Sequence, residues 1–292
     1  MKIRQTARKK VQSLDMGGYG TKNFNHSVAM LFQENIKFNV FSQRKLGANI
    51  GRFFTPYYTK RTSQPYKSFP GAKKISMDDY ADLIQLDHNF FDLVSTRRSG
   101  REYDKDYKIS LNEIYSLLHY SYGISQRSKI EGIEEEGHVG WRVVPSAGGL
   151  YPLEIYFVML NSHLEEGLYH YLPNENAIEQ VNAGPYMDKL KDILFTDPYI
   201  DLQSAGMVAI VTSVNERTML KYGDRGYRFI LNEAGAVVNQ LSLVSEALDF
   251  GSCVVGAFKD YRLEEMLDID GVFESIQAVL TIGKKGEVVC KI

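Results

Sequence analysis

The 292-residue chain has few of the residues that mark several common classes of protein. Its only cysteines are Cys253 and Cys290, too few for a disulfide framework or a cysteine-based metal cluster, which predicts a reducing, cytoplasmic location. Six histidines are present, but none belongs to an H-E-x-x-H motif and no two are four residues apart. We interpret them as structural or exposed and expect no metal site.

Long apolar runs and a large net charge are also lacking. No apolar stretch reaches the length of a bilayer span, and the basic start of the chain is not followed by the apolar core of a secretory signal, so we expect no membrane association and no secretion. The formal net charge of -2 gives no reason to expect nucleic acid as a partner. Neither G-x-G-x-x-G nor G-x-x-x-x-G-K-[ST] occurs, which removes the main support for a Rossmann or P-loop fold.

Residues 1–70 differ in composition from the rest of the chain. They mix aromatic, basic and glycine residues with weak periodicity, apart from a short helical pattern over residues 28–36. Residues 57–65 are typical of an exposed connection, and Phe69-Pro70-Gly71 is a turn signal. We therefore predict an appended region, residues 1–70, that contacts substrate or a dimer partner, and a main domain, residues 71–292.

The main domain has the pattern of an α+β fold. Capping patterns at Ser76 and Ser110 predict two helices, and apolar residues three and four positions apart predict a long helix over residues 227–249, with Gly251 just past its end. A tight turn at residues 173–176 would join two of the predicted strands. Apolar runs predict strands at residues 153–160, 167–172, 177–181, 207–213 and 276–282.

The most informative motif is Pro-Ser-Ala-Gly-Gly-Leu-Tyr-Pro, residues 145–152, which runs directly into the first of these strands. Two adjacent glycines let the backbone take open conformations, so that a flat or anionic group can approach its N–H groups. An ordinary glycine-rich turn before a strand is the alternative, and the loop taken alone favours it.

A second motif is Arg97-Arg98-Ser99-Gly100-Arg101. Three guanidinium groups and a hydroxyl suit a phosphate, because the planar guanidinium binds anionic oxygens through two hydrogen bonds and keeps its charge. Taken alone, such a charge run is more typical of a solvated surface.

Lys221 and Tyr222 lie immediately before the long predicted helix. A lysine acts as a base only if burial or nearby cations lower its pKa, and Arg225 and Arg228 could supply such cations. A surface lysine beside an interfacial tyrosine is the simpler interpretation of the pair taken alone.

Small residues at 251–258 predict a loop that leaves the long helix, and Gly283-Lys284-Lys285-Gly286 follows the last predicted strand. Small residues let backbone amides approach a ring system, and a lysine at a strand end can reach a phosphate. A helix stop and a hairpin turn with solvated lysines are the alternatives.

In this order, these motifs together resemble the SagB-type azoline dehydrogenases of the nitroreductase superfamily. The pieces are Arg-Arg-Ser-x-Arg, Pro-Ser-Ala-Gly-Gly-Leu-Tyr-Pro, the Lys-Tyr-Gly-Asp-Arg-Gly-Tyr-Arg-Phe run with Glu233-Ala234-Gly235, and Gly-Ala-Phe at residues 256–258. The resemblance covers roughly residues 66–285 and thins over the first 65 residues. It implies an α+β sandwich with a central antiparallel sheet and FMN bound between the two subunits of a homodimer.

The resemblance also implies roles for individual residues. Lys221 and Tyr222 align with the family's essential pair, which ordinary nitroreductases do not carry. For the FMN phosphate the resemblance implies Arg97, Arg98, Ser99 and Arg101, helped by Lys284 or Lys285. For the flavin ring it implies Pro145, Ser146, Ala147 and Gly149. Gly256 and Ala257 are implied to approach the opposite side of that ring.

The implied activity is FMN-dependent oxidation of thiazoline or oxazoline rings to thiazoles or oxazoles in a peptide natural product. The peptide would be made ribosomally and delivered by a cyclodehydratase, or be held on a peptidyl carrier protein. Two alternatives stay open: a generic NAD(P)H-dependent FMN nitro- or quinone reductase, and a non-catalytic scaffold subunit of an azole synthetase.

Overall fold

The computed structural model describes residues 27–55, 57–58, 62, 66–129 and 138–286. Cys290, the basic start of the chain and most of the predicted connection at 57–65 lie outside the described residues. The chain divides into two compact units, residues 1–48 and 49–292. Helix α3 (Val28–Asn35) confirms the helical pattern near the N-terminus, and α4 (Val40–Arg52) follows it. The boundary expected at residue 70 stays a prediction.

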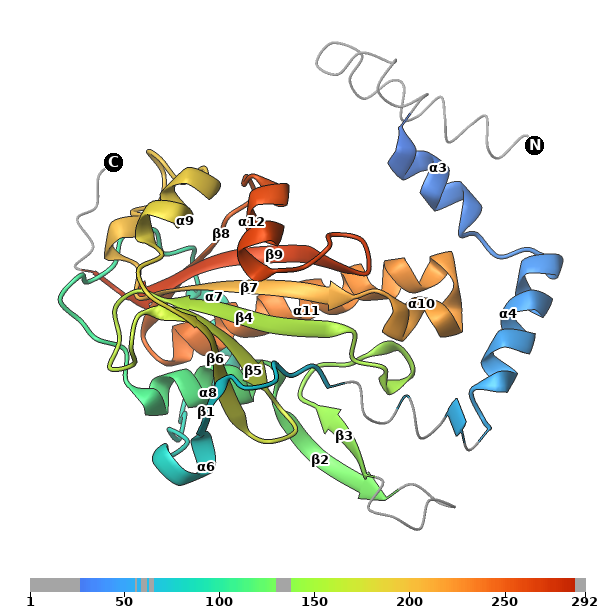
Figure 1. Cartoon of the computed structure of the whole chain (residues 1–292), viewed down its shortest axis with the longest axis horizontal. Coiled ribbons are helices and arrows are strands. Elements are labelled where there is room, and N and C mark those ends of the chain that lie inside the picture. Colours follow the sequence, from blue (N-terminus) through green and yellow to red (C-terminus); the bar gives the residue numbers. More distant parts are fainter. Residues whose placement is uncertain (1–26, 56, 59–61, 63–65, 130–137, 287–292) are drawn as a thin grey trace. The chain divides into compact units, whose positions relative to one another are not determined.

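A seven-stranded antiparallel sheet forms the centre of the second unit (Figure 1). Its strand order is β1-β6-β5-β4-β7-β9-β8. Five of the strands confirm the predicted ones to within two residues at each end, because their apolar runs are long and bounded by turn residues. The strands are β1 (Lys73–Ser76), β4 (Leu153–Met159), β5 (Gly167–Leu172), β6 (Ala177–Ala183), β7 (Met207–Val214), β8 (Phe250–Val254) and β9 (Glu274–Lys284).

Both faces of the sheet are buried. Along β4, Ile155 and Phe157 belong to a core shared with helices α8 (Leu111–Tyr122) and α11 (Asp224–Ala247). The intervening Tyr156 and Val158 belong to a second core. That core is shared with α9 (Met187–Ile193) and α12 (Asp260–Leu267), which lie on the other side of the sheet in Figure 1. This alternation follows from the two-residue period of a strand and confirms the α+β sandwich.

The helices confirm some sequence predictions and correct others. Ser110 and Glu113 form the predicted capping box of α8, and the long helix forms as α11 but begins at Asp224. Gly223 separates it from α10 (Glu216–Tyr222) because its φ of 57° and ψ of -148° are not helical. Ser76 caps only the short α6 (Met77–Tyr80), and α7 (Phe90–Thr96) was not predicted. No helix among the described residues is both long and apolar enough to cross a bilayer.

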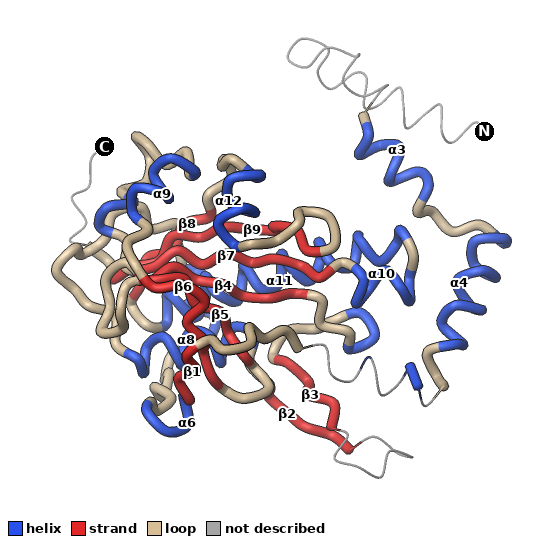
Figure 2. Tube along the Cα trace, viewed as in Figure 1, coloured by secondary structure: helices blue, strands red, loops and turns tan. Residues whose placement is uncertain are grey.

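The prediction that residues 251–258 form a loop is wrong for its first half, which is strand β8. Gly100 lies against this strand, and its N–H donates to the Ser252 carbonyl at 3.0 Å. A methyl group added at Gly100 would lie 2.6 Å from the Cα of Gly251, so the two chains approach closely because neither residue has a side chain. The sequence also did not predict the hairpin of β2 (Ile124–Lys129) and β3 (His138–Arg142), which forms a sheet of its own (Figure 2).

Gly100→Ala should lower the free energy of unfolding by roughly 1–3 kcal/mol, because the added methyl group meets backbone that has no room to yield. Urea unfolding measures the effect. Gly235→Ala is the control: it lies inside α11, where an added methyl group meets nothing within 4 Å, and it should raise stability by about 0.5–1 kcal/mol. Equal stability of Gly100→Ala and wild type would contradict the close packing of Gly100 on β8.

Candidate active site

The Gly-Gly loop and the Lys-Tyr pair, far apart in the sequence, meet in the structure. Gly148 and Gly149 have φ angles of 67° and 66°, in the left-handed region that glycine adopts readily. A methyl group on Gly148 would lie 2.6 Å from the Tyr222 hydroxyl and 2.9 Å from the Lys221 Nζ. The absence of a side chain at Gly148 is therefore what lets both functional groups reach the loop backbone.

A hydrogen-bond network holds the Gly-Gly loop on helices α8 and α11. Ser146 Oγ accepts from the Tyr151 N–H at 2.9 Å, and the Ser146 hydroxyl also bonds to the carboxyl group of Glu233 on α11. Tyr122 of α8 donates to the same carboxyl group at 2.9 Å. Burial raises the pKa of Glu233 to about 7, although both hydrogen bonds and the nearby Arg142 lower it. The loop is thus tied to two core helices through one carboxyl group.

Arg142 closes the network on the side of the hairpin. Its guanidinium lies 4.1 Å from the centre of the Tyr122 ring and 5.0 Å from that of Tyr151, in the range of cation–π interactions. Its backbone N–H donates to the Tyr151 hydroxyl at 3.0 Å. Tyr151 has a φ of 42°, unusual for a residue with a side chain, and these contacts keep it there.

Lys221 lies in an aromatic and partly buried environment. Its Nζ is 5.7 Å from the centre of the Phe53 ring and 5.5 Å from that of Tyr222. Burial lowers the pKa of Lys221, in the direction that a base requires. The expectation that Arg225 and Arg228 would do this is not supported, because burial is the cause and Arg225 lies over the Phe229 ring. Burial raises the pKa of Tyr222, so its phenol stays protonated and can donate a hydrogen bond.

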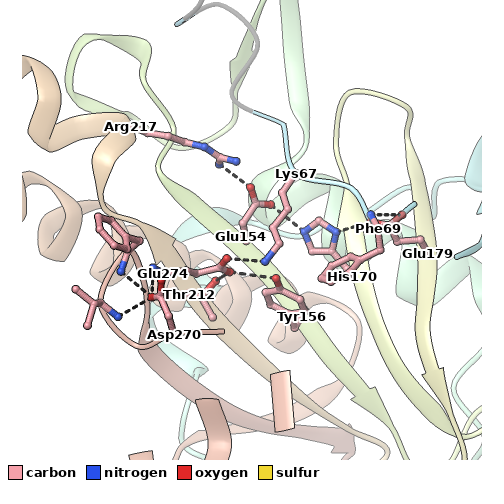
Figure 3. Close-up of polar contacts among 12 residues, drawn as sticks. Lys67, Phe69, Glu154, Tyr156, His170, Glu179, Thr212, Arg217, Asp270 and Glu274 are labelled. Carbon is pink, nitrogen blue, oxygen red and sulfur yellow. Dashed lines mark hydrogen bonds and ion pairs between the residues drawn. The ribbon is translucent and has the colours of Figure 1, made fainter. Parts of the chain in front are cut away.

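A buried ion chain anchors the helix that carries Lys221 (Figure 3). Arg217, one helical turn before Lys221 on α10, contacts Glu154 at 2.5 Å. The other oxygen of Glu154 lies 2.9 Å from His170 Nε2, and His170 Nδ1 lies 2.8 Å from Glu179. The ion chain therefore runs across β4, β5 and β6 to the candidate active site.

Neighbouring groups of this ion chain stabilise one another's charged forms. Burial alone would raise the pKa of Glu154, but Arg217 and His170 hold it at about 2. Burial alone would lower the pKa of His170, but its hydrogen bonds to Glu154 and Glu179 raise it overall. The sequence alone predicts only a structural or exposed role for His170 and does not indicate its partners. The available signal was an ionisable residue inside each of two otherwise apolar strands, Glu154 in β4 and His170 in β5.

Residues 67–69 lie against the part of the sheet that holds the ion chain. The Phe69 N–H donates to Glu179 at 3.1 Å, and Lys67 forms an ion pair with Glu274 at 2.6 Å. Glu274 also accepts from Tyr156 at 3.0 Å, as Figure 3 shows. This segment is thereby held against the sheet next to the ion chain.

Away from the Gly-Gly loop, beside β8, lies the arginine group, which consists of the predicted phosphate-binding residues Arg97, Arg98, Ser99 and Arg101. Ser99 pairs with Ser252, and the Arg101 carbonyl accepts from the N–H of Asp201 at 2.8 Å. The Arg98 guanidinium folds back onto the carbonyl groups of Ser95 and Arg97, at 2.9 and 2.8 Å. The side chains of Arg98 and Arg101 are exposed, and that of Arg97 is half-buried.

The two C-terminal lysines of the predicted site lie at the same end of the sheet. Lys284 pairs with Phe250 in the ladder between β9 and β8, and its Nζ contacts Asp249 at 3.0 Å. Lys285 forms an ion pair with Glu246 at 2.8 Å. Both carboxylates would compete with a phosphate for these lysines, so their predicted role stays a prediction. Gly256 and Ala257 follow β8 and are exposed.

Within one chain the arginine group and the Gly-Gly loop are well separated. Ser252, beside the arginines, pairs with Ile282, whereas Ser213, at the end of β7 that leads to α10, pairs with Ser275. The two partners on β9, Ser275 and Ile282, are seven residues apart, which corresponds to about 24 Å of strand. The arginine group and the Gly-Gly loop therefore lie toward opposite ends of the sheet.

The profile of the nitroreductase family matches residues 94–284, a range that holds the Gly-Gly loop, the Lys-Tyr pair and all four residues of the arginine group. The chain belongs to the nitroreductase family. It is 32% identical over 197 residues to MJ1384 of Methanocaldococcus jannaschii, a protein named as a nitroreductase, with 67% of this chain and 91% of the relative covered.

Two further comparisons reach proteins of peptide processing. The chain is 25% identical over 194 residues to the microcin B17-processing protein McbC of Escherichia coli, covering 64% of this chain and 66% of McbC. A chain of the E. coli microcin synthetase McbBCD complex has the same fold, with a TM-score of 0.55 at 22% identity, covering 80% of this chain and 84% of that one. The chain thus spans about two thirds of McbC.

The nitroreductase fold is also shared with a crystal structure from Anabaena variabilis, at a TM-score of 0.66 and 25% identity. That match covers 88% of this chain but 46% of the Anabaena chain. The nitroreductase-like sandwich expected from the sequence is therefore confirmed.

Glu233→Gln should remove a pH dependence of stability. Because the pKa of Glu233 rises from its ordinary 4.5 to about 7, the native state holds a proton that the unfolded chain has lost between these values. Wild-type stability should therefore fall by roughly 3 kcal/mol relative to Glu233→Gln as pH rises from about 4.5 to 7, and then level off. Urea unfolding between pH 4.5 and 8 measures this, with Glu102→Gln, at an exposed position, as control. Parallel profiles for wild type and Glu233→Gln would contradict the assignment.

Proposed function

We propose that this chain is an FMN-dependent azoline dehydrogenase of the SagB type, which oxidises thiazoline or oxazoline rings in a peptide to thiazoles or oxazoles. The observation that carries the proposal is the approach of Lys221 and Tyr222 to the backbone of Gly148. A generic nitroreductase needs no base at this point, whereas loss of a ring proton does.

The residues present fit a flavin. Gly148 and Gly149 offer open backbone, the loop of Gly256 and Ala257 is exposed, and the arginine group can hold a phosphate. When bound, FMN would supply a two-electron acceptor, which aromatisation of the ring requires. Protein residues would supply its position and the proton chemistry.

Lys221 has the role of the base. As a neutral amine it would take the acidic proton from the ring carbon that was the Cα of the parent residue, and Nζ would become an ammonium group. The partial burial that lowers its pKa raises the neutral fraction near neutral pH. Tyr222, which keeps its proton, would orient the ring or Lys221 by hydrogen bonding.

The separation within one chain supports a homodimer. An FMN molecule is too short to contact both the arginine group and the Gly-Gly loop across about 24 Å of strand. If both groups hold one flavin, they must come from two copies, and a symmetric dimer would form two equal sites. One FMN per subunit in a dimer is therefore the proposed state.

The comparisons support a peptide substrate. McbC and the trifolitoxin-processing protein TfxB of Rhizobium leguminosarum are both named for peptide processing, and TfxB is 23% identical to this chain over 179 residues. That match covers 60% of this chain and 47% of TfxB. We extend this role to the chain, with the azoline peptide delivered by a cyclodehydratase or held on a peptidyl carrier protein.

A second candidate is a generic NAD(P)H-dependent nitro- or quinone reductase, favoured by the similarity to MJ1384 over most of that relative's length. The two functions differ in their need for Lys221. Turnover of NADPH with a nitroaromatic compound, without any oxidation of azolines and without loss in Lys221→Ala, would favour the reductase.

Lys221→Ala should keep the yellow colour and the dimer but lose azoline oxidation by about 10²- to 10⁴-fold, the usual contribution of a placed base. Tyr222→Phe should show a smaller loss. The wild-type rate should rise with pH as Lys221 deprotonates, provided that chemistry limits turnover. The control is Lys189→Ala, because Lys189 also lies over a tyrosine ring, 5.0 Å from that of Tyr186. A wild-type rate in Lys221→Ala would show that Lys221 is not the base.

Arg97→Ala and Arg101→Ala should each weaken FMN binding by about 1.5–3 kcal/mol, the range for hydrogen bonds to a charged group. Fluorescence titration of the apoprotein with FMN measures the dissociation constant, and circular dichroism checks that the fold is kept. Arg127→Ala, on the β2–β3 hairpin, is the control, since that arginine bonds to the Asn174 carbonyl away from β8. Unchanged FMN affinity in both test variants would show that the arginine group is an ordinary solvated surface and not a phosphate site.

A further inference from the structure

The β2–β3 hairpin brings the only tryptophan of the chain to the Gly-Gly loop. A methyl group on Gly149 would lie 3.1 Å from Cζ3 of the Trp141 ring. The neighbouring Gly148 meets Lys221 and Tyr222 in the same way. Two successive glycines thus bring the indole and the base to adjacent points of one loop.

Trp141 is held in a defined orientation. Its Nε1–H donates to Ser128 Oγ at 3.0 Å, and its carbonyl accepts from Ser125 at 3.0 Å. The next residue, Arg142, is bonded through its N–H to Tyr151 of the loop. The ring is therefore fixed relative to the loop rather than free to turn.

Much of this ring nevertheless faces outward. Trp141 is 42% exposed, whereas a tryptophan with a purely structural role is highly buried on average. Because the N–H already has its partner in Ser128, the exposed part of the ring is apolar surface that gains nothing from water. An oriented, exposed indole next to a proposed base suits the binding of a flat group.

We propose that Trp141 is a specificity-determining residue that stacks on the five-membered heterocycle, or on the adjoining azole of the same peptide, while Lys221 takes the proton. This inference rests on the proposed function and names the feature of the substrate that is recognised. A planar, polarisable ring is preferred over the uncyclised serine or cysteine side chain, which offers no face to stack on.

Variants of the holoenzyme test this. With an azoline peptide, Trp141→Ala should raise KM roughly 2- to 10-fold, as expected for loss of one aromatic stacking contact, and leave kcat nearly unchanged. Trp141→Phe should recover most of the loss. Tyr80→Ala is the control, since it removes an aromatic side chain that is 71% exposed on α6.

A binding experiment gives a second readout that does not depend on turnover. Because Trp141 is the only tryptophan, all indole emission of the protein comes from this position. Titration of the FMN-loaded wild type with an azole-containing product peptide should change that emission to saturation. The same peptide with its serine and cysteine residues uncyclised should not.

The outcomes separate this inference from the proposed function. If wild type oxidises azolines but Trp141→Ala keeps the wild-type KM and the product peptide leaves the emission unchanged, the proposal for Trp141 is wrong and the proposed function stands. If Trp141→Ala binds FMN more weakly but keeps the wild-type KM once it is saturated with FMN, the indole contacts the cofactor and the proposal is equally wrong. If wild type oxidises no azoline, the proposed function fails and the inference with it.

Discussion

The buried ion chain from Glu179 through His170 and Glu154 to Arg217 connects the centre of the sheet to the helix of the proposed base. Two carboxylates alternate with Arg217 and with His170, whose pKa is raised by its hydrogen bonds to both carboxylates, so each carboxylate has a partner that can carry the opposite charge. Such pairing is what makes buried charge tolerable, since a single unpaired ion would cost several kcal/mol. Three neighbouring strands contribute one residue each, and Arg217 extends the network to α10, which carries Lys221.

The regular parts of the fold were predictable because their signals are local. The strands β4 and β7 are almost continuously apolar, and α11 carries a clear apolar stripe, so periodicity was sufficient to predict them. Strand β8 was missed since its residues, Phe-Gly-Ser-Cys-Val, have little strand character of their own. Its structure comes from pairing with β9 and from the contact with Gly100, which lies about 150 residues earlier in the chain.

The residues of the candidate site also divide into those that local sequence motifs indicate and those that only the fold brings together. Sequence motifs identified the Gly-Gly loop and the Lys-Tyr pair, but only the fold brings Gly148 into contact with Tyr222. Glu233 was noted only as part of a motif, because its role in holding Ser146 depends on the packing of α11 under the loop. Trp141 was missed for a related reason: it lies in a hairpin of weak strand signal, and only the fold places its ring against Gly149, eight residues later in the sequence.

Gly223 determines how the helix of Lys221 and the long helix are joined. Its φ of 57° and ψ of -148° lie in a region that is open almost only to glycine, so the helical hydrogen bonding stops there and restarts in a new direction. The orientation of α10 is set by Arg217 and also by α11 itself. The Tyr222 ring contacts that of Phe229, with 5.1 Å between the ring centres, and a methyl group on Gly226 would lie 3.0 Å from the Cα of Met219. The proposed base is therefore coupled to the longest helix of the fold, so that a change in the packing of α11 would also displace the amine.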